Sequence, residues 1–541
     1  MSTDALELNE LAEPSSPTDD AAEHRRILVI VGALLLGMLL AALDQTIVAT
    51  ALPTISADLG GLSKLSWVVT AYLLTSTIST PLWGKLGDLF GRKKLFQAAI
   101  VIFLIGSVLS GISQNMAELI GFRALQGIGG GGLIVGAQAI IGDVVSPRQR
   151  GRYQGYFGAV FGLTSVAGPL IGGFFTQSLN WRWVFYVNVP IGIVALLVVG
   201  AVLHLPRTRT ERHIDYLGTT LLGGAVTAFI LLTTWGGTTY PWTSTPVLSM
   251  AVIGVVLLVA FCFAENRAEE PLIPLELFRN RIFSATSGIG FIVGFGMFGA
   301  IIYLPLYLQT VHGATPTSSG LQLVPLMMGL LLTSIVTGQL ITKTGRYKIF
   351  PILGTAVMAV GLFLLSTMTP TTTLLLSSVY MFILGVGLGG VMQVLVIAVQ
   401  NAVPYRHLGT ATSAATFFRS IGGSFGVAVF GTIFNSRLRV NLPKYLPAQA
   451  IQHLGGGSIT SNPAQLRALP PVIHHGFVQA FSHSLQTVFL IGVPVAIVAF
   501  ALTWLLKEVP LREQAFLGED GDVVGSTREV PDSRKTVDIP T

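Results

Sequence analysis

One short motif occurs twice in the chain, and the rest of the sequence is best interpreted from it. The first copy is Gly84-Lys85-Leu86-Gly87-Asp88-Leu89-Phe90-Gly91-Arg92-Lys93-Lys94, and the second is Gly338-Gln339-Leu340-Ile341-Thr342-Lys343-Thr344-Gly345-Arg346-Tyr347-Lys348. The copies align without gaps at a separation of 254 residues. Two glycine-rich stretches, 127–131 and 385–389, align in the same way at a separation of 258 residues. This spacing predicts two related halves with additional segments between them.

The composition excludes an ordinary soluble protein. Of the 541 residues, 51% are hydrophobic, 11% are charged and 61 are glycine, and the mean hydropathy is +0.69. Soluble domains carry about 25% charged residues. The net charge of +6 does not indicate nucleic-acid binding, because the basic residues stand in short runs between apolar stretches. The single cysteine, Cys262, excludes a disulfide framework and a cysteine-rich metal site.

The apolar stretches are long enough to cross a membrane as helices. A crossing helix needs about 20 mostly apolar residues, and the short alternating strands of a barrel do not occur. The predicted fold is therefore an all-α polytopic membrane protein with two six-helix halves and two extra central spans. The fourteen predicted spans are 27–51, 64–83, 95–113, 117–141, 153–177, 183–205, 216–235, 247–264, 283–309, 319–341, 350–367, 373–399, 408–434 and 485–507.

The distribution of Lys and Arg predicts that both termini are cytoplasmic. With the long segments left out, one side holds 19 of these residues and the other holds 2. The richer side is cytoplasmic by the positive-inside rule, and we expect a multi-pass protein of the cell membrane. The predicted divisions are a disordered cytoplasmic tail (1–24), an N-terminal half (27–205), two additional spans (206–266), a C-terminal half (267–507) with a long extracellular loop (435–484), and a disordered cytoplasmic tail (508–541).

Three further motifs lie in the first half of the chain. They are Leu43-Asp44-Gln45-Thr46-Ile47-Val48-Ala49-Thr50-Ala51-Leu52-Pro53, Arg123-Ala124-Leu125-Gln126-Gly127, and Gly162 followed by Gly168-Pro169-Leu170-Ile171-Gly172-Gly173. Together with the repeated loop they resemble the major facilitator superfamily, in its fourteen-span drug:proton antiporter branch, over about residues 27–507. The resemblance implies a transporter and not an enzyme. Its two halves would alternate access to a midplane site and exchange protons for small exported molecules such as drugs, antibiotics or metabolites.

Asp44 is the residue that we expect to carry protons. It lies 17 residues into the first predicted span, where a charge is costly and an acid is functional by default. No Asp or Glu occurs between Glu276 and Glu508, and the other acids lie near the membrane margins. Arg123 lies at a similar depth and needs a partner, so we expect it to pair with Asp44 in one state. The resemblance gives Arg123 a role in proton relay. The alternatives are purely structural contacts for both residues.

The first copy of the repeated loop is a candidate gate. We interpret its acid as a latch, which caps a helix start or pairs with a cation on a neighbouring helix. The resemblance implies that the loop gates the outward-open state, and the alternative is a plain topology anchor. The second copy carries Thr342 at the acid's position, so only the first half has the charged latch. The gating residues are Gly84, Gly87, Asp88, Gly91 and Arg92.

Two other groups of residues are candidates for moving and binding parts. Small residues give the fifth span a smooth, bendable face, which suits either a moving interface or ordinary tight packing; they are Gly162, Gly168, Pro169, Gly172 and Gly173. Arg419 either faces the substrate cavity, where it would bind anionic or polar groups, or pairs across the bundle. The expected cavity lining is Gln126, Phe291, Phe295, Tyr303, Tyr307 and Arg419.

No cofactor is predicted apart from the coupling proton. Residues 127–132 match a dinucleotide fingerprint, but that motif requires a βαβ unit. The sequence contains no Walker motif, so no ATPase subunit is implied. The expected partners are a small amphiphilic substrate and the lipid bilayer, without metal or nucleic acid, and the expected state is a monomer.

The sequence is compatible with three functions. The first is proton-coupled export of small amphiphilic compounds, and the second is export of lipids or lipid-like products on the same fold. The third is a membrane sensor without transport, which is disfavoured because the tails of 24 and 34 residues are too short for a signalling domain. The lack of acids in the second half favours neutral, zwitterionic or anionic substrates over lipophilic cations.

Overall fold

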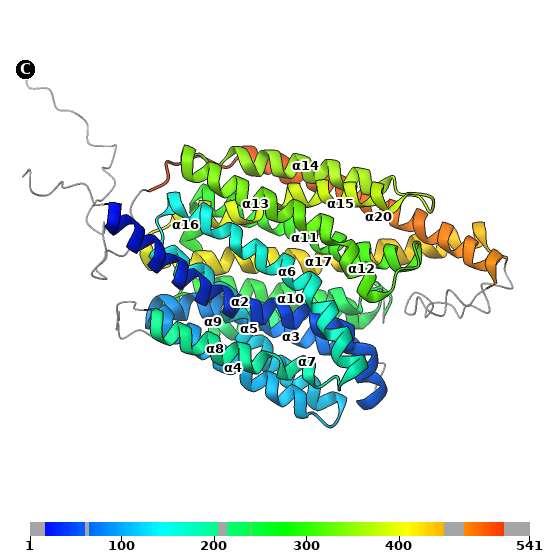
Figure 1. Ribbon diagram of the computed structural model, residues 1–541, viewed down its shortest axis with the longest axis horizontal. Coiled ribbons are helices and arrows are strands. Elements are labelled where there is room, and N and C mark those ends of the chain that lie inside the picture. Colours follow the sequence, from blue (N-terminus) through cyan, green and yellow to red (C-terminus); the bar gives the residue numbers. More distant parts are fainter. Residues whose placement is uncertain (1–16, 60–63, 204–213, 238–239, 448–469, 513–541) are drawn as a thin grey trace, which may run out of the picture.

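The fold is helical throughout the part of the chain that the structure describes. This computed structural model describes residues 17–59, 64–203, 214–237, 240–447 and 470–512. In these ranges the chain forms helices and connecting turns, with one isolated bridge and no named strand. Figure 1 shows the long helices lying side by side in one bundle. The predicted all-α fold is confirmed.

The long helices match the fourteen predicted spans. Thirteen segments of the described chain are long and apolar enough to cross a membrane. The fourteenth, α3, is 26 residues long, and its Thr and Ser residues lower its hydropathy. Three spans consist of two consecutive helices each. The helices are α2 (Pro17–Leu59), α3 (Leu65–Phe90), α4 (Arg92–Ile112), α5 (Met116–Val144), α6 (Pro147–Ser178), α7 (Trp183–Tyr186), α8 (Asn188–Val202), α9 (Tyr216–Trp235), α10 (Thr245–Glu265), η3 (Leu275–Arg279), α11 (Arg281–Thr310), α12 (Pro316–Gln322), α13 (Val324–Thr344), α14 (Ile349–Ser366), α15 (Leu374–Gly389), α16 (Met392–Ala402), η4 (Tyr405–His407), α17 (Leu408–Tyr445) and α20 (Pro471–Trp504).

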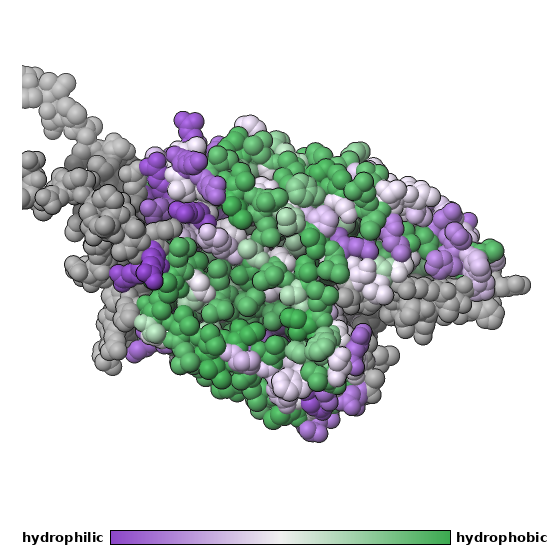
Figure 2. Space-filling model, in the orientation of Figure 1, coloured by the Kyte–Doolittle hydropathy of each residue, from purple (hydrophilic) through white to green (hydrophobic). Residues whose placement is uncertain are grey.

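The surface of the bundle matches a lipid bilayer. Figure 2 shows hydrophobic side chains over the middle of the visible face and hydrophilic side chains at its two ends. Many large apolar side chains are exposed, and α10 alone exposes Val252, Val255, Val256 and Phe263. Soluble monomers rarely expose such continuous apolar surface. The chain is therefore a multi-pass membrane protein.

Equivalent helix pairs pack in the two halves. In the first half α5 packs against α3 and α4, and in the second half α15 packs against α13 and α14. Likewise α2 packs against α6, and α11 packs against α17. In Figure 1, α6 and α17 lie between the helices of the two halves. The extra helices α9 and α10 pack against each other, and α9 also contacts α3 and α17.

Both copies of the repeated loop use the same backbone device. Gly91 has φ +90° between α3 and α4, and its counterpart Gly345 has φ +67° at the end of α13. A side chain at either position would be strained in this left-handed region. The aligned glycines therefore both serve a positive φ, although the two turns differ, with ψ 134° at Gly91 and ψ 4° at Gly345. We call the end of the bundle that carries these loops the inner end, and the opposite end the outer end.

Two predicted non-membrane segments are wrong in part. Helix α2 begins at Pro17, inside the predicted tail 1–24. Half of the predicted loop 435–484 is helical, because α17 continues to Tyr445 and α20 begins at Pro471. The two extensions pack on each other beyond the predicted spans, which stabilises both; the Phe434 and Phe481 rings are 5.1 Å apart. Residues 1–16 and 448–469 lie outside the described residues.

The start of the predicted tail 508–541 is also structured. Leu506 and Leu511 are buried in a small cluster with Tyr347. The Tyr347 hydroxyl donates to the carbonyl of Lys507 at 2.9 Å. At the end of this segment the Arg148 backbone N–H donates to the carbonyl of Arg512 at 3.3 Å. Residues 505–512 thus run from the second half to α6 of the first half, and residues 513–541 lie outside the described chain.

Two glycines on α5 offer a matched test of this packing. A Cβ at Gly129 would lie 2.5 Å from the backbone nitrogen of Phe103 on α4, whereas a Cβ at Gly121 would meet nothing within 4 Å. We expect Gly129→Ala to lower stability by about 1–3 kcal/mol, because α4 and α5 must separate. Gly121→Ala should be neutral or stabilising by up to about 1 kcal/mol. Thermal unfolding in detergent measures both, and equal effects would contradict the packing described here.

Candidate functional site

A buried ion pair joins α2 and α5. The Arg123 Nη1 atom lies 2.5 Å from Oδ2 of Asp44. Asp44 is 0% exposed and Arg123 is 1% exposed. A charge of either sign is costly in this environment unless it is paired. The two residues that the sequence predicted to pair therefore do so in this conformation, through a direct contact.

Two amides complete the surroundings of the Asp44 carboxylate. Gln126 Nε2 donates to Asp44 Oδ1 at 2.8 Å, and Gln126 Oε1 accepts a hydrogen bond from Arg123 Nη1 at 2.8 Å. Asn188 Nδ2, at the start of α8, donates to Asp44 Oδ1 at 3.3 Å. The carboxylate thus receives hydrogen bonds from one cation and two neutral amides.

Aromatic rings enclose the guanidinium group. The Arg123 Cζ atom lies 4.3 Å from the centre of the Tyr72 ring and 5.8 Å from that of Phe185. Its Nε donates to the carbonyl of Val68 at 3.3 Å. Rings at these distances attract a cation and exclude water from it. Arg123 therefore keeps favourable contacts of its own besides the one with Asp44.

The glycine-rich stretch 127–131 brings this site together. A Cβ at Gly127 would overlap the backbone of Tyr72, and one at Gly130 would overlap the Tyr72 hydroxyl. Only glycine lets α3 approach α5 this closely, so the stretch is packing glycine and no nucleotide motif. The Tyr72 hydroxyl is buried at this contact.

The structure adds two residues to the Asp44 site that were not predicted and places one predicted residue there. Gln126 was expected in the substrate cavity; in this conformation it is 0% exposed and hydrogen-bonds to Asp44. Asn188 and Tyr72 were not predicted. Asn188 could have been found from the sequence. It is an amide inside an otherwise apolar span, and a buried polar group requires a hydrogen-bond partner. Nothing in the sequence distinguished Tyr72 from other aromatic residues.

The acid of the gating loop caps a helix of the other half. The backbone N–H groups of Gly409 and Thr410, at the start of α17, donate to Asp88 at 2.9 and 2.8 Å. The Thr410 hydroxyl donates to the same carboxylate at 3.0 Å. A carboxylate at a helix N-terminus satisfies free donors and the helix dipole. The latch predicted from the sequence is therefore present as a cap that joins the two halves at the inner end.

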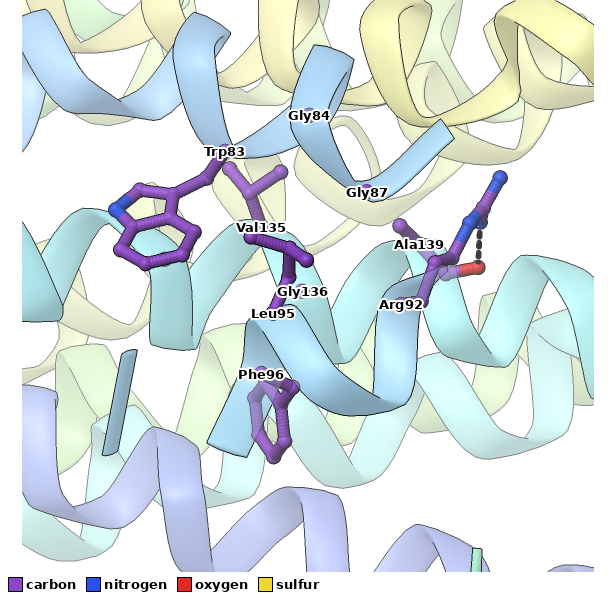
Figure 3. A pocket seen from close by; sticks show the side chains of 10 residues that line it. Trp83, Gly84, Gly87, Arg92, Leu95, Phe96, Val135, Gly136 and Ala139 are labelled. Carbon is purple, nitrogen blue, oxygen red and sulfur yellow. Dashed lines mark hydrogen bonds between the residues drawn. The ribbon is translucent and has the colours of Figure 1, made fainter. Parts of the chain in front are cut away.

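Arg92 holds this acid in place. Its Nη2 lies 2.9 Å from Asp88, and its Nη1 lies 3.0 Å from Asp143 on α5. Figure 3 shows Arg92 reaching the carbonyl of Ala139, beside Gly84 and Gly87. The hollow in this view has a volume of about 10 Å³, enough for about one water and too small for a substrate. Asp143 was expected at the membrane margin only, and its contact with Arg92 was not predicted.

Polar contacts continue across the two halves beside the cap. Arg150 Nη1 donates to Gln400 Oε1 at 3.2 Å, and Gln400 Nε2 donates to the carbonyl of Gln138 at 3.1 Å. Arg148 Nε donates to the carbonyl of Thr342 at 3.1 Å. Residues 148 and 342 lie in opposite halves, so the second repeated loop also contacts the first half. The inner end is closed by these contacts and by the Asp88 cap.

The fifth span lies between the two halves, as its small residues suggested. On one side of α6, a Cβ at Gly168 or Gly172 would overlap the hydroxyls of Thr46 and Thr50 on α2. On the other side, a Cβ at Gly162 would lie 2.9 Å from Leu331 on α13. Pro169 lies inside the continuous helix α6 and faces Gly320 of α12, and Gly173 is half-buried. The geometry is that of a tightly packed interface between the two halves.

The expected cavity residues divide into two groups. Tyr303 is 7% exposed and Tyr307 is 1% exposed, and both belong to the core of the second half. In this conformation they do not line a cavity, because Tyr307 donates to the Thr369 carbonyl at 2.9 Å and Tyr303 packs on Phe434. The second group is half-buried, and for it a place in the cavity lining stays a prediction; its members are Phe291, Phe295 and Arg419.

Arg419 differs from the other buried cations. Among the described residues no ion pair and no side-chain hydrogen bond of Arg419 is found, which argues against a pair across the bundle in this conformation. No cluster of three or more potential metal ligands occurs in the described chain either.

Comparison with known proteins agrees with this architecture. Residues 34–427 match the Major Facilitator Superfamily. An MFS-type transporter of Mycobacterium tuberculosis is 43% identical over 538 residues, covering 98% of this chain and 77% of that protein. The multidrug transporter protein MdtP of Bacillus subtilis is 39% identical over 515 residues, covering 91% of this chain and 95% of MdtP.

A solved structure shares the fold at low sequence identity. The proton:xylose symporter XylE matches with a TM-score of 0.58 and 15% identity, covering 90% of this chain and 97% of that chain. The resemblance inferred from the motifs is thus confirmed by sequence and by fold. This chain belongs to the major facilitator superfamily, and it is a membrane transporter and not an enzyme.

Proposed function

We propose that this protein exports small amphiphilic compounds from the cell in exchange for protons, as a monomer of the cell membrane with both termini in the cytoplasm. The names of its relatives support export of drugs, since one of them is a multidrug transporter protein of Bacillus subtilis and another is a multidrug resistance protein of the same species. The observation that carries proton coupling is the buried Asp44–Arg123 pair.

Protonation of Asp44 changes the balance of this site. The neutral acid no longer attracts Arg123, and Gln126 and Asn188 lose a charged acceptor. Removing one charge of a buried pair costs several kcal/mol unless the other finds new partners. The Tyr72 and Phe185 rings and the Val68 carbonyl supply part of that replacement. We infer that proton binding frees α2 to move relative to α5.

The inner gate provides the second part of the cycle. This conformation is closed at the inner end by the Asp88 cap on α17, so a substrate would leave from the outer end. Opening the inner end requires α17 to separate from Asp88 and α6 to separate from α13. Alternating access then follows from exchange between this conformation, closed at the inner end, and one in which the inner end is open.

Asp44→Asn tests the coupling. Asparagine fits the site and still accepts from Gln126 and Arg123, so we expect folded protein that no longer moves protons when substrate is added. The measurement is substrate-driven proton movement in proteoliposomes. Asp58→Asn is the matched control on the same helix, because Trp181 and Arg182 hydrogen-bond to Asp58 and hold its pKa below the usual range. Retained coupling in Asp44→Asn would refute the proposal.

Asp88→Asn tests the gate. The neutral side chain has one acceptor oxygen in place of two and loses its charge attraction to Arg92 and to the N-terminus of α17, which should weaken the closed inner end by about 0.3–2 kcal/mol. We expect faster hydrogen exchange in the Gly409–Ser413 backbone and greater accessibility of a cysteine placed at that turn. The exposed acid Glu276, which no hydrogen bond joins to the other half in the described residues, is the control as Glu276→Gln. Unchanged exchange in Asp88→Asn would show that the cap does not hold the gate.

Arg419 bears on the substrate class. It is half-buried in a half without carboxylates, since no Asp or Glu occurs between Glu276 and Glu508. An anionic or polar group of a substrate would supply the missing partner. We therefore propose a preference for neutral, zwitterionic or anionic compounds over lipophilic cations; a lipid-like substrate remains the alternative, and the same assay with a fluorescent lipid tests it.

Arg419→Gln separates charged from neutral substrates. A charge-assisted hydrogen bond contributes about 1.5–3 kcal/mol, so export of an anionic dye should fall about tenfold or more in apparent affinity. Export of a neutral dye of similar size should change little. The readout is dye efflux from vesicles at a fixed proton gradient. An equal loss for both dyes would indicate a structural role for Arg419.

A further inference from the structure

Two carboxyl groups meet at the inner end of the extra helices, away from the Asp44 site. Asp215 caps the start of α9, where its Oδ1 accepts from the Gly218 N–H at 2.7 Å. Glu265 is the last residue of α10 and is 3% exposed. Its Oε1 accepts from the N–H of Ile273, in the segment that leads to α11. Each acid therefore has one oxygen that is well satisfied.

The other two oxygens face each other without a donor. Asp215 Oδ2 and Glu265 Oε2 are both buried, and neither has a hydrogen-bond partner in the described residues. Gly218 lies against both, since a Cβ there would overlap Asp215 Oδ2 and lie 2.8 Å from Glu265 Oε2. The two side chains are within hydrogen-bonding reach of each other. Ionised carboxylates only accept hydrogen bonds, so two such oxygens at this distance repel unless a proton lies between them.

We propose that Asp215 and Glu265 form a second proton-binding site, in which one shared proton joins the inner ends of α9 and α10. When the proton binds, one carboxylate becomes a carboxylic acid, and its O–H donates to the remaining carboxylate. The net charge of the pair changes from −2 to −1. Adjacent carboxyl groups that share one proton in this way are known chemistry.

The surrounding charges do not replace this proton. Lys85, on α3, attracts Glu265 electrostatically, but its Nζ lies 2.7 Å from Glu270 and makes its ion pair there. Arg267 is exposed and lines a hollow of about 430 Å³ together with Asp215. His407, on η4, lies near Lys85 and Glu270. None of these residues has a hydrogen bond to the two facing oxygens in the described chain.

The same hollow gives protons a route to the pair. Asp215 lines it, and it is open at the inner end between α9 and α10. The pair is also connected to the inner gate. Glu265 accepts a hydrogen bond from the N–H of Ile273, and Glu270, in the same segment 266–273, pairs with Lys85 of the gating loop. Loss of the shared proton would push α9 and α10 apart and release residues 266–273. The site therefore senses the pH at the inner end and passes it to the gate.

Infrared spectroscopy of the purified full chain tests the shared proton. We expect a protonated carboxyl band that persists in wild type near neutral pH and disappears in both Glu265→Gln and Asp215→Asn. Asparagine keeps the helix cap, so at least the second variant should fold. Glu269→Gln, an exposed acid of the same segment, should leave the band unchanged. Asp44→Asn should also keep it, which separates this site from the proposed transport site.

Thermal unfolding at several pH values gives an independent measurement. The shared proton is bound by the folded state only, so the wild-type midpoint should fall as the pH rises from about 5 to about 7 and level off once the pair has lost the proton. The decrease should be smaller in Glu265→Gln, because a glutamine amide donates to Asp215 at any pH. A wild-type spectrum without a protonated band, or a band that survives in both pair variants, would overturn the proposal.

Discussion

The structure depends on the neutralisation of one carboxylate in the interior of a membrane protein. Asp44 is surrounded by donors from two other helices, Arg123 and Gln126 on α5 and Asn188 on α8. A buried charge without these partners would be destabilising by several kcal/mol. The pair therefore fixes how α2, α5 and α8 pack, and the glycines of α5 let α3 come close enough to place Tyr72 over Arg123. In the proposed cycle a proton neutralises this carboxylate, and the interaction that holds these helices then becomes the one that is switched.

The two halves share a backbone plan but differ in chemistry. Each repeated loop turns at a glycine with positive φ and contacts the other half, the first at the start of α17 and the second at the start of α6. The first contact is made by the Asp88 carboxylate and the second by the Thr342 carbonyl. Only the first of these contacts depends on the charge of a side chain in the loop. Within the described membrane-spanning helices the acids thus lie in the first half and the extra helices, while the second half contributes Arg419 and apolar surface.

Much of this arrangement followed from the residues. The helical class, the fourteen spans, the repeat, the Asp44–Arg123 pairing and the Asp88 latch were all predicted, because each rests on a local or one-dimensional signal: hydropathy over about 20 residues, an aligned motif, or a charge that must be satisfied. The errors fall where tertiary contacts extend a helix. The ends of α17 and α20 support each other beyond the apolar stretch, and residues 508–512 are ordered by Tyr347 and α6.

The sequence by itself determined which residues carry charge in the membrane and that they need partners, since the cost of an unpaired charge does not depend on the details of the fold. Only the tertiary structure decided who the partners are. Gln126 belongs to Asp44 and not to a cavity, Tyr307 lies in the core, and Glu265 meets Asp215 across a glycine. These contacts join residues far apart in the chain. They depend on how each helix is rotated about its axis, which is set by close packing at glycines. A glycine in the sequence does not show which neighbouring helix it will contact.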